Sequence, residues 1–307
     1  MKPFDYSTLP AMRDGLFINE HVKPDNVGFD WVLPEQRTYT DEEHARWDFL
    51  YNRMMEEVPG RACDEFIEGL KTLGLDQGGV PSLADVNEKL SALTGWTLVP
   101  VPALIPDNVH FYHLANKRFP VGDFLRTEEQ IDYLDQPDVF HDVFAHAPML
   151  ANASFSKFLQ NYGKAGYEAM RHNRLRSVAA LYMHTVELGL INTDKGLRIY
   201  GAAILSSHKE TKFALEGKSP NRFHMDFKRM LRTDYVLSDV QQSYFVIDSF
   251  DDLFNQMANF PFAETYSKIE PSYQFAASAI VESDKVYQKG TQEYSLRGGR
   301  FSNAVPV

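Results

Sequence analysis

The chain has 307 residues, of which 44% are hydrophobic, so it can form one substantial hydrophobic core. Its formal net charge of -11 argues against general binding to nucleic acid or anionic membranes, and no stretch approaches the roughly 18 consecutive apolar residues of a membrane span. The single cysteine, Cys63, excludes an intramolecular disulfide, and no secretory signal is visible, so we expect a cytoplasmic protein.

The first predicted elements follow an irregular lead over residues 1–30. Thr40–Glu43 has the form of a capping box and precedes apolar residues at helical spacing, so a helix is predicted to start there and to end by Pro59. A second helix is predicted to begin at Ser82 and to end at Gly95, because serine caps helix N-termini and glycine commonly follows helix C-termini.

The rest of the chain carries mainly helical signals, and its strand signals are few and short. Apolar stripes of helical period predict three further helices, at residues 154–170, 174–188 and 249–259. Runs with strand character predict short strands at residues 97–101, 197–200 and 243–247. We therefore expect a mainly α-helical fold with small antiparallel β elements.

One catalytic domain is expected over residues 31–288, because no repeat or low-complexity block divides the chain. The tail over residues 289–307 contains Gly290, Gly298 and Gly299 with little periodic apolar pattern, so we expect weak order there. The tail also lacks a heptad seam, which favours a monomer.

Residues 137–148 read PDVFHDVFAHAP and contain two histidines, His141 and His146. Imidazole is a common metal ligand, but a regular α-helix places residues at this spacing about 140° apart around its axis. A shared metal therefore requires the helix to end or bend near His146, and Pro148 provides a reason for it to do so. The pair alone leaves metal binding and ordinary packing equally open.

Glu187 lies in residues 178–189, a stretch too apolar to be a solvated helix face. A carboxylate there needs a partner, which could be a metal ion or an arginine such as Arg174 or Arg176. His184, three residues earlier, could compete as a ligand or line a pocket. With the two histidines, Glu187 would complete the set of two imidazoles and one carboxylate that binds non-heme Fe(II) with open positions.

Five segments, taken in chain order, carry a family resemblance: residues 113–120, 137–148, 185–190, 200–207 and 241–250. Together they resemble the pterin-dependent aromatic amino acid hydroxylases, above all the short bacterial phenylalanine 4-hydroxylases. The resemblance implies a single hydroxylase-type catalytic domain. It also implies a monooxygenase that uses Fe(II), a tetrahydropterin and dioxygen to hydroxylate the ring of a free aromatic amino acid, most of all phenylalanine to tyrosine.

The resemblance assigns the iron site to named residues, with His141, His146 and Glu187 as the Fe(II) ligands. The resemblance also places Ser206 and Tyr182 near the iron, and Asp142 and His184 are further candidates for its surroundings. Ser206 would hydrogen-bond one of the iron-binding histidines and fix the orientation of its ring. Without the resemblance, Ser206 could simply cap a helix, and Tyr182 could be a packing residue.

The resemblance also assigns residues to the substrate and cofactor pockets. Arg126 would pair with the carboxylate of the substrate, a task suited to a planar guanidinium, and Pro137 would line the aromatic site. Met183 occupies a position associated with substrate choice, and His110 occupies the position of the pterin-stacking residue. Arg126 could otherwise be a surface arginine, and Pro137 a packing residue.

Several positions depart from the family pattern. Bacterial members usually have phenylalanine where His110 stands, and Met183, His184 and Leu188 replace aromatic residues. Ala145 replaces the usual glycine before the second histidine of the iron site. With Met183 and Leu188 in place of aromatic residues, the pocket could be larger or more flexible and could accept an indole, so tryptophan is the alternative substrate.

Two other functions remain open from the residues alone. A metal phosphohydrolase would activate water between metals held by histidines and aspartates. The candidates for such a site are His110 or His113, His141, Asp142 and Asp194. A binding protein that keeps the hydroxylase fold but has lost its coupling to the cofactor is the other alternative.

Overall fold

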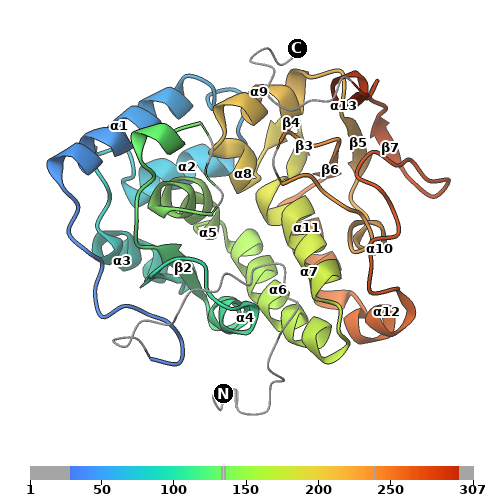
Figure 1. The fold of residues 1–307 in the computed structure, drawn as a ribbon, viewed down its shortest axis with the longest axis horizontal. Coiled ribbons are helices and arrows are strands. Elements are labelled where there is room, and N and C mark those ends of the chain that lie inside the picture. Colours follow the sequence, from blue (N-terminus) through green and yellow to red (C-terminus); the bar gives the residue numbers. More distant parts are fainter. Residues whose placement is uncertain (1–27, 133, 135, 238, 297–307) are drawn as a thin grey trace.

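The computed structural model describes residues 28–132, 134, 136–237 and 239–296 of the chain, and helices dominate it (Figure 1). The longer helices are α1 (Asp41–Met55), α2 (Asp64–Leu73), α3 (Leu83–Thr94), α4 (Asp107–Ala115), α6 (Ala153–Arg171), α7 (Leu175–Tyr182), α9 (His208–Glu216), α11 (Phe250–Asn259) and α12 (Phe262–Lys268). The one-turn helices are α5 (Ala147–Leu150), α8 (Ala202–Leu205), α10 (Phe227–Met230) and α13 (Glu293–Leu296). Within the described residues, no helix combines the length and the apolar character that crossing a membrane requires.

Two small sheets accompany the helices. Their strands are β1 (Thr97–Val101), β2 (Arg118–Gly122), β3 (Leu190–Thr193), β4 (Gly196–Ile199), β5 (Asn221–His224), β6 (Ser243–Ile247) and β7 (Val286–Gln288). Strands β1 and β2 form one sheet, and the other five lie in the order β4-β3-β6-β5-β7. The predicted class, mainly helical with small β elements, is confirmed.

The directions of the strands correct one part of that prediction, since the β elements are not all antiparallel. Strand β2 pairs with β1 in parallel, and β6 pairs in parallel with both β3 and β5. The pairs β3–β4 and β5–β7 are antiparallel. Parallel neighbours need a crossover connection, which α4 supplies between β1 and β2. The apolar pattern of a short strand does not encode the direction of its neighbour.

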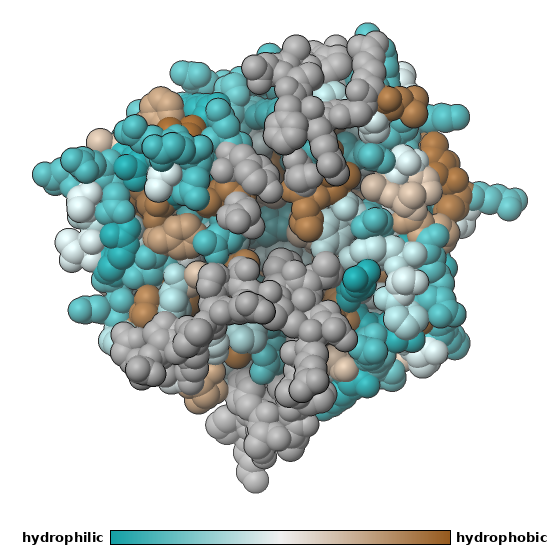
Figure 2. Space-filling model, viewed as in Figure 1, coloured by the Kyte–Doolittle hydropathy of each residue, from teal (hydrophilic) through white to brown (hydrophobic). Residues whose placement is uncertain are grey.

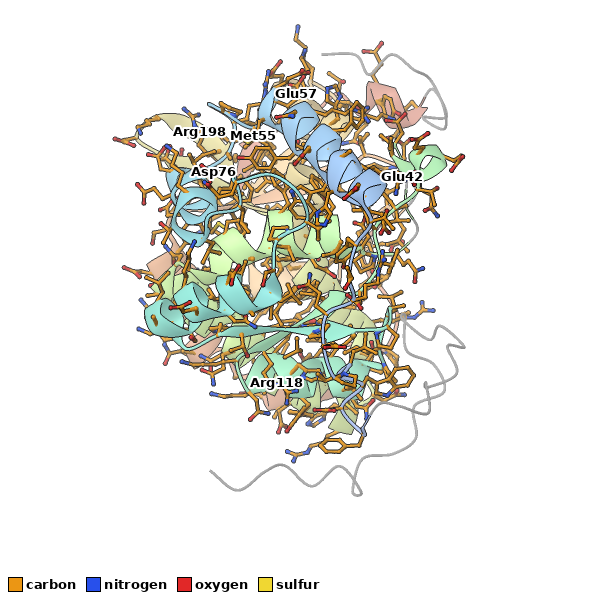
Figure 3. The ribbon with its side chains drawn as sticks, turned by 90° about the vertical axis from the view of Figure 1, so that its left-hand side faces the viewer. Glu42, Met55, Glu57, Asp76, Arg118 and Arg198 are labelled. Carbon is orange, nitrogen blue, oxygen red and sulfur yellow. The ribbon has the colours of Figure 1, made fainter. Side chains whose placement is uncertain are left out.

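The predicted capping box at the start of α1 is present. The Thr40 hydroxyl accepts a hydrogen bond from the Glu43 amide at 3.3 Å, and the Glu43 carboxylate accepts one from the Thr40 amide at 2.9 Å. The helix ends at Met55, before the predicted stop at Pro59. Figure 3 shows α1 along one side of the molecule, with Glu42 and Met55 near its two ends.

Helix α3 also matches its predicted limits, whereas α2 and α4 were not predicted. Ser82 caps α3, and the helix ends at Gly95, whose φ of 76° favours glycine. Helices α2 and α4 follow Cys63 and Pro106, and neither has a side-chain cap. Without a capping residue, the sequence offers only a weak signal for a helix start.

Helix α6 lies in the middle of the fold, packed against α4 and α11 (Figure 1). Two of its glycines allow α4 to approach closely. A Cβ atom at Gly166 would lie 2.2 Å from the ring of Phe111, and one at Gly163 would lie 2.4 Å from the amide nitrogen of Ala115. Larger residues at these glycines would push α4 away, so α6 sets the position of α4.

Part of the C-terminal tail is packed onto the domain. Residues 289–296 include α13, where Tyr294 is buried beside Phe213 with the two ring centroids 5.4 Å apart. The weak order predicted for the whole tail therefore does not describe this part of it. Residues 297–307, and residues 1–27 of the predicted lead, lie outside the described residues. The predicted domain boundaries stay a prediction.

Aromatic rings in the core anchor the segment that carries the two histidines. The ring of Phe140 stacks on that of Phe144 at 4.9 Å and contacts Trp47 edge-on at 5.1 Å. All three residues are buried. On the face shown in Figure 2, by contrast, hydrophilic residues cover most of the described surface, and hydrophobic residues occur between them in separate groups.

Candidate active site

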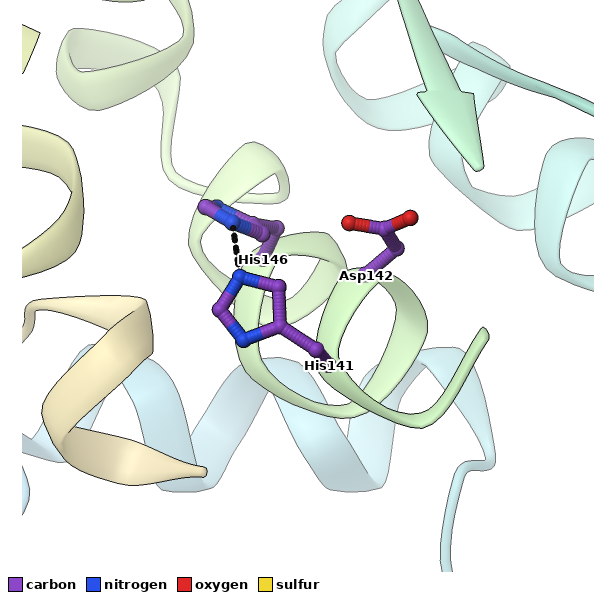
Figure 4. A group of neighbouring side chains, drawn as sticks. All are labelled: His141, Asp142 and His146. Carbon is purple, nitrogen blue, oxygen red and sulfur yellow. Dashed lines mark hydrogen bonds between the residues drawn. The ribbon is translucent and has the colours of Figure 1, made fainter. Parts of the chain in front are cut away.

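His141 and His146 lie at the two ends of one face of a π-helix that spans Phe140–His146. Hydrogen bonds in a π-helix join residues five apart, so residues at this spacing lie one above the other. The two Nε2 atoms are 3.1 Å apart (Figure 4). The segment ends at His146, as one of the two predicted possibilities, and its wider helix aligns the two histidines; Pro148 lies in the first turn of α5.

Glu187 ends a second π-helix, Met183–Glu187, and its carboxylate faces both imidazoles. Its Oε1 lies 3.2 Å from His146 Nε2, and its Oε2 lies 3.5 Å from His141 Nε2. Among the described residues, nothing donates a well-formed hydrogen bond to the buried Oε2. The alternative partner Arg174 instead donates from Nε to the carbonyl of Ile269. We call His141, His146 and Glu187 the His–His–Glu cluster.

The charges of the His–His–Glu cluster suit a divalent cation. Burial alone would raise the pKa of Glu187, but the imidazoles of His146 and His141 lower it well below its usual range. Burial lowers the pKa of His146, whereas for His141 the attraction of Glu187 outweighs burial and raises the pKa. An ionised carboxylate and two ring nitrogens thus converge in a buried place, as a non-heme iron site requires.

Ser206 fixes the orientation of the His141 ring. The Ser206 hydroxyl lies 2.8 Å from His141 Nδ1 and donates to the carbonyl of Ala202 at 2.9 Å. Because its hydrogen is used on Ala202, its oxygen accepts from Nδ1–H of the imidazole. This assignment leaves the Nε2 lone pair of His141 directed at the cluster.

Asp142 is a second carboxylate beside the imidazoles, since one of its oxygens lies within 4.8 Å of their ring nitrogens. Its Oδ2 accepts a hydrogen bond from the Gly122 amide at 2.8 Å, and burial raises its pKa to about 7. Figure 4 shows its carboxylate apart from the contact between His141 and His146. Glu187 is the better third ligand, because both its oxygens face the imidazoles and one has no other partner.

The His–His–Glu cluster opens into a cavity of about 740 Å³, a size that suits small-molecule binding. Tyr182 lies in its wall, with its ring centroid 6.5 Å from that of His146. Burial and the nearby Glu187 carboxylate raise the pKa of the Tyr182 phenol well above its usual range, so it stays protonated. Pro137 and Met183 line the same cavity.

Arg126 also lines the cavity, but it already holds a carboxylate of the protein. Its Nε and Nη2 donate to the two oxygens of Asp138 at 2.9 and 2.8 Å. Burial would raise the pKa of Asp138, but its bonds to Arg126 outweigh burial and lower it. Among the described residues, none accepts a hydrogen bond from Nη1 of Arg126. That edge of the guanidinium is the one left for a ligand.

His110 lies in the cavity wall and meets the ring of Tyr182 edge-on, with the centroids 5.8 Å apart. Burial lowers the pKa of His110 to about 3, so its imidazole is neutral at physiological pH. Asp107 lines the cavity one helical turn earlier.

His184 is not brought to this cavity. Its Nε2 lies 3.2 Å from the carbonyl oxygen of Thr233, and its ring packs against Phe245 at 4.9 Å. It is absent from the described residues that line the cavity. The sequence suggested that His184 lies near the iron. Its contacts with Thr233 and Phe245 do not support that position.

The sequence profile of the biopterin-dependent aromatic amino acid hydroxylases matches residues 30–291 of this chain. The chain belongs to this family. A phenylalanine-4-hydroxylase of Caulobacter vibrioides is 47% identical to it, over 90% of this chain and 94% of the relative. The predicted family is confirmed.

Solved structures of a bacterial family member have the same fold. A structure of phenylalanine hydroxylase from Chromobacterium violaceum with iron and phenylalanine bound matches with a TM-score of 0.80 at 46% identity, covering 85% of this chain and 95% of that one. A second structure of that enzyme, with bound iron(III) and oxidised cofactor 7,8-dihydrobiopterin, matches with a TM-score of 0.80 at 47% identity, covering 87% and 95%.

The site proposed for a phosphohydrolase does not come together. Asp194 is exposed in the turn between β3 and β4. His113 is buried and its Nε2 lies 2.7 Å from the carbonyl oxygen of Asp30. Neither lies among the described residues that line the cavity.

Two acidic residues of the site were missed by sequence reasoning. Asp138 holds Arg126 and also accepts a hydrogen bond from the His141 amide at 3.0 Å. Asp138 lies twelve residues after Arg126, so no local pattern in the sequence pairs the two residues. Asp107 looked like an ordinary acidic residue in the first turn of a helix, which interacts favourably with the helix dipole.

Proposed function

We propose that this protein is an iron- and tetrahydropterin-dependent monooxygenase that converts free phenylalanine to tyrosine. The observation that carries the proposal is the His–His–Glu cluster at the wall of a cavity that also presents Arg126. Family membership and the relatives named phenylalanine-4-hydroxylase support the same reaction.

His141, His146 and Glu187 would hold Fe(II), since their three ligand atoms face one another and Glu187 Oε2 has no other partner among the described residues. Bound iron would supply the dioxygen chemistry, with the reduced pterin as the donor of two electrons. Ser206 would keep the His141 ring in the tautomer that binds metal through Nε2. Asp142 would lie beside the iron ligands, with one of its oxygens held by the amide of Gly122.

Arg126 would bind the carboxylate of the amino acid through its Nη1 edge, while Asp138 holds the guanidinium in place. Pro137 and Met183 would contact the aromatic ring, and the neutral Tyr182 phenol would face the reacting atoms. His110 would contact the pterin. The described walls of the cavity would limit access of water to the reacting groups.

Phenylalanine is favoured over tryptophan as the substrate. The Chromobacterium violaceum enzyme that was solved with iron and phenylalanine bound is 46% identical to this chain. Met183 lines the cavity with an apolar side chain and provides no strong hydrogen-bond acceptor for the N–H group of an indole.

Turnover with a panel of amino acids tests this proposal. The iron-loaded protein is supplied with tetrahydrobiopterin and with phenylalanine, tyrosine or tryptophan in parallel, and oxygen uptake and products are measured. We expect tyrosine formation from phenylalanine to dominate. Dominant indole hydroxylation would instead identify a tryptophan hydroxylase, and iron binding without any stimulated oxygen uptake would identify a non-catalytic binding protein.

We also infer that the protein acts as a monomer in the cytoplasm. The support is its single cysteine, Cys63, which is buried, and a C-terminal tail without a heptad seam. Its partners on this view are the amino acid and the pterin, rather than nucleic acid or a membrane. Sizing at several protein concentrations would reveal a concentration-dependent mass if the monomer is wrong.

A further inference from the structure

Asp107 is a cavity-lining carboxyl with no function in the site as described so far. It lies three residues before His110 on α4, so the two side chains share one face of that helix, and both line the cavity. Helix α4 is fixed against α6 by Phe111, one turn after Asp107, and by Ala115, which pack closely on Gly166 and Gly163. The position of Asp107 at the cavity is therefore set by a rigid contact between two helices.

The carboxyl of Asp107 has no partner among the described residues. It does not cap α4, because no side-chain hydrogen bond is present at the start of this helix, and it takes part in no ion pair there. Burial alone acts on it and raises its pKa to about 6. Asp107 is half-buried in the cavity wall. A carboxylate that is partly removed from water and has no hydrogen-bond donors destabilises a protein, so the position is better explained by a ligand that brings donors.

The two proposed ligands of the cavity differ in the donors they offer. The carboxylate of the amino acid suits Arg126, and its phenyl ring carries no donor. The pyrimidine ring of a pterin has an N3–H group and a 2-amino group side by side, and these two donors match the two oxygens of a carboxylate. The neutral imidazole of His110 can contact the face of the same ring system.

We propose that Asp107 determines specificity for the pterin by accepting hydrogen bonds from its N3–H and 2-amino groups, while His110 contacts the face of the ring. This inference rests on the proposed function, since it assigns an orientation to the cofactor of that reaction. It places recognition of the pterin on α4 and recognition of the amino acid on Arg126. The α-ammonium group of the amino acid, a competing partner for Asp107, would lie beside the carboxylate that Arg126 binds.

The first test measures binding without turnover. The iron-loaded protein is titrated with 7,8-dihydrobiopterin by calorimetry, as wild type and as Asp107→Asn, Asp107→Ala and Asp85→Asn. We expect both Asp107 variants to bind about ten- to a hundredfold more weakly, the range for a lost hydrogen bond to a charged group. Asp85, an exposed aspartate in the first turn of α3, is the matched control and should leave the affinity unchanged.

The second test exchanges the hydrogen-bonding edge of the ligand. In 6,7-dimethyllumazine a carbonyl oxygen replaces the 2-amino group of 6,7-dimethylpterin, so its edge presents one donor and one acceptor. The wild type should prefer the pterin. An asparagine amide also presents one donor and one acceptor. Asp107→Asn should therefore reduce or reverse the preference, whereas Asp107→Ala should bind both compounds weakly.

Three results would overturn the inference. Unchanged affinity for dihydrobiopterin in Asp107→Asn would show that the carboxyl does not contact the pterin. If Asp107→Asn keeps the wild-type preference for 6,7-dimethylpterin over 6,7-dimethyllumazine, Asp107 does not bind the N3–H and 2-amino edge. A weaker affinity for phenylalanine alone would assign the carboxyl to the substrate ammonium. If the wild type binds no pteridine, the proposed function fails as well, whereas pterin-dependent turnover that survives these results contradicts only the assignment of Asp107.

Discussion

At the metal end of the cavity, His141 and Glu187 are held by neighbours at 2.8 to 3.5 Å, whereas Asp107, on the α4 side, has no partner among the described residues. Arg126 is likewise held in place before a ligand binds, by its ion pair with Asp138. Side chains that are already oriented lose little conformational entropy when a ligand binds. Such pre-orientation suits metal binding and catalysis, which depend on precise geometry. On the α4 side, the hydrogen-bond donors for Asp107 would come from the bound ligand, which suits recognition of that ligand.

Removing a ligand from the metal end should have the largest effect. Glu187→Ala deletes the carboxylate and leaves two neutral imidazoles, so iron content and hydroxylation should fall by more than the about hundredfold that loss of an outer-shell contact causes. Iron content by mass spectrometry, together with tyrosine formation, measures this. Glu264→Gln, at an exposed glutamate of α12, is the control. Full iron loading in Glu187→Ala would reassign the carboxylate ligand to Asp142.

Loosening the metal end without removing a ligand should have a smaller effect. Ser206→Ala removes the acceptor of the His141 Nδ1–H group and frees the ring to rotate. Affinity for iron should fall by about ten- to a hundredfold, the usual range for a partner of a metal-binding histidine. Competition with a chelator measures this affinity. An unchanged value would mean that packing alone orients the imidazole.

Arg126→Lys tests the predicted carboxylate site. Lysine lacks the planar fork, so both the pair with Asp138 and the free Nη1 edge are lost. KM for phenylalanine should rise by about tenfold or more, the effect of losing a charged hydrogen bond. Phenethylamine, which has no carboxylate, should be affected far less. Equal losses for both compounds would point to a structural function for this arginine.

His110→Phe should have the smallest effect, and it should be favourable. A phenyl ring offers a larger apolar face than the neutral imidazole, and a good aromatic contact contributes about 0.5–1.5 kcal/mol. Affinity for 7,8-dihydrobiopterin should therefore rise by about two- to tenfold. A weaker affinity in this variant would mean that an imidazole nitrogen, rather than the ring face, contacts the pterin.

The sequence singled out His141, His146 and Glu187 as candidate ligands, but it did not predict the type of helix that brings the two histidines together. Spacing on a regular helix places His141 and His146 on different faces, and only the π-helix aligns them. Apolar periodicity does not distinguish a π-helix from an α-helix, so the family resemblance had to supply the convergence. Asp107 was missed because an acidic residue in a first helical turn has an ordinary explanation.

Local signals explain which parts of the fold were predictable. The capping residues Thr40 and Ser82 start the helices that were predicted from them, because capping is decided by a few neighbouring residues. The parallel pairing of β1 with β2 depends on α4 and its contact with α6, which joins residues far apart in the chain. Such contacts leave no local pattern in the strands.

The central claim is that iron at the His–His–Glu cluster and a reduced pterin act together on phenylalanine. The most direct measurement is the amount of tyrosine formed per dioxygen consumed by the iron-loaded protein, with and without tetrahydrobiopterin. We predict a ratio close to one with the pterin, and no tyrosine when either the pterin or iron is left out. Tyrosine formation that continues without the pterin, or oxygen consumption that yields no hydroxylated amino acid, would contradict the claim.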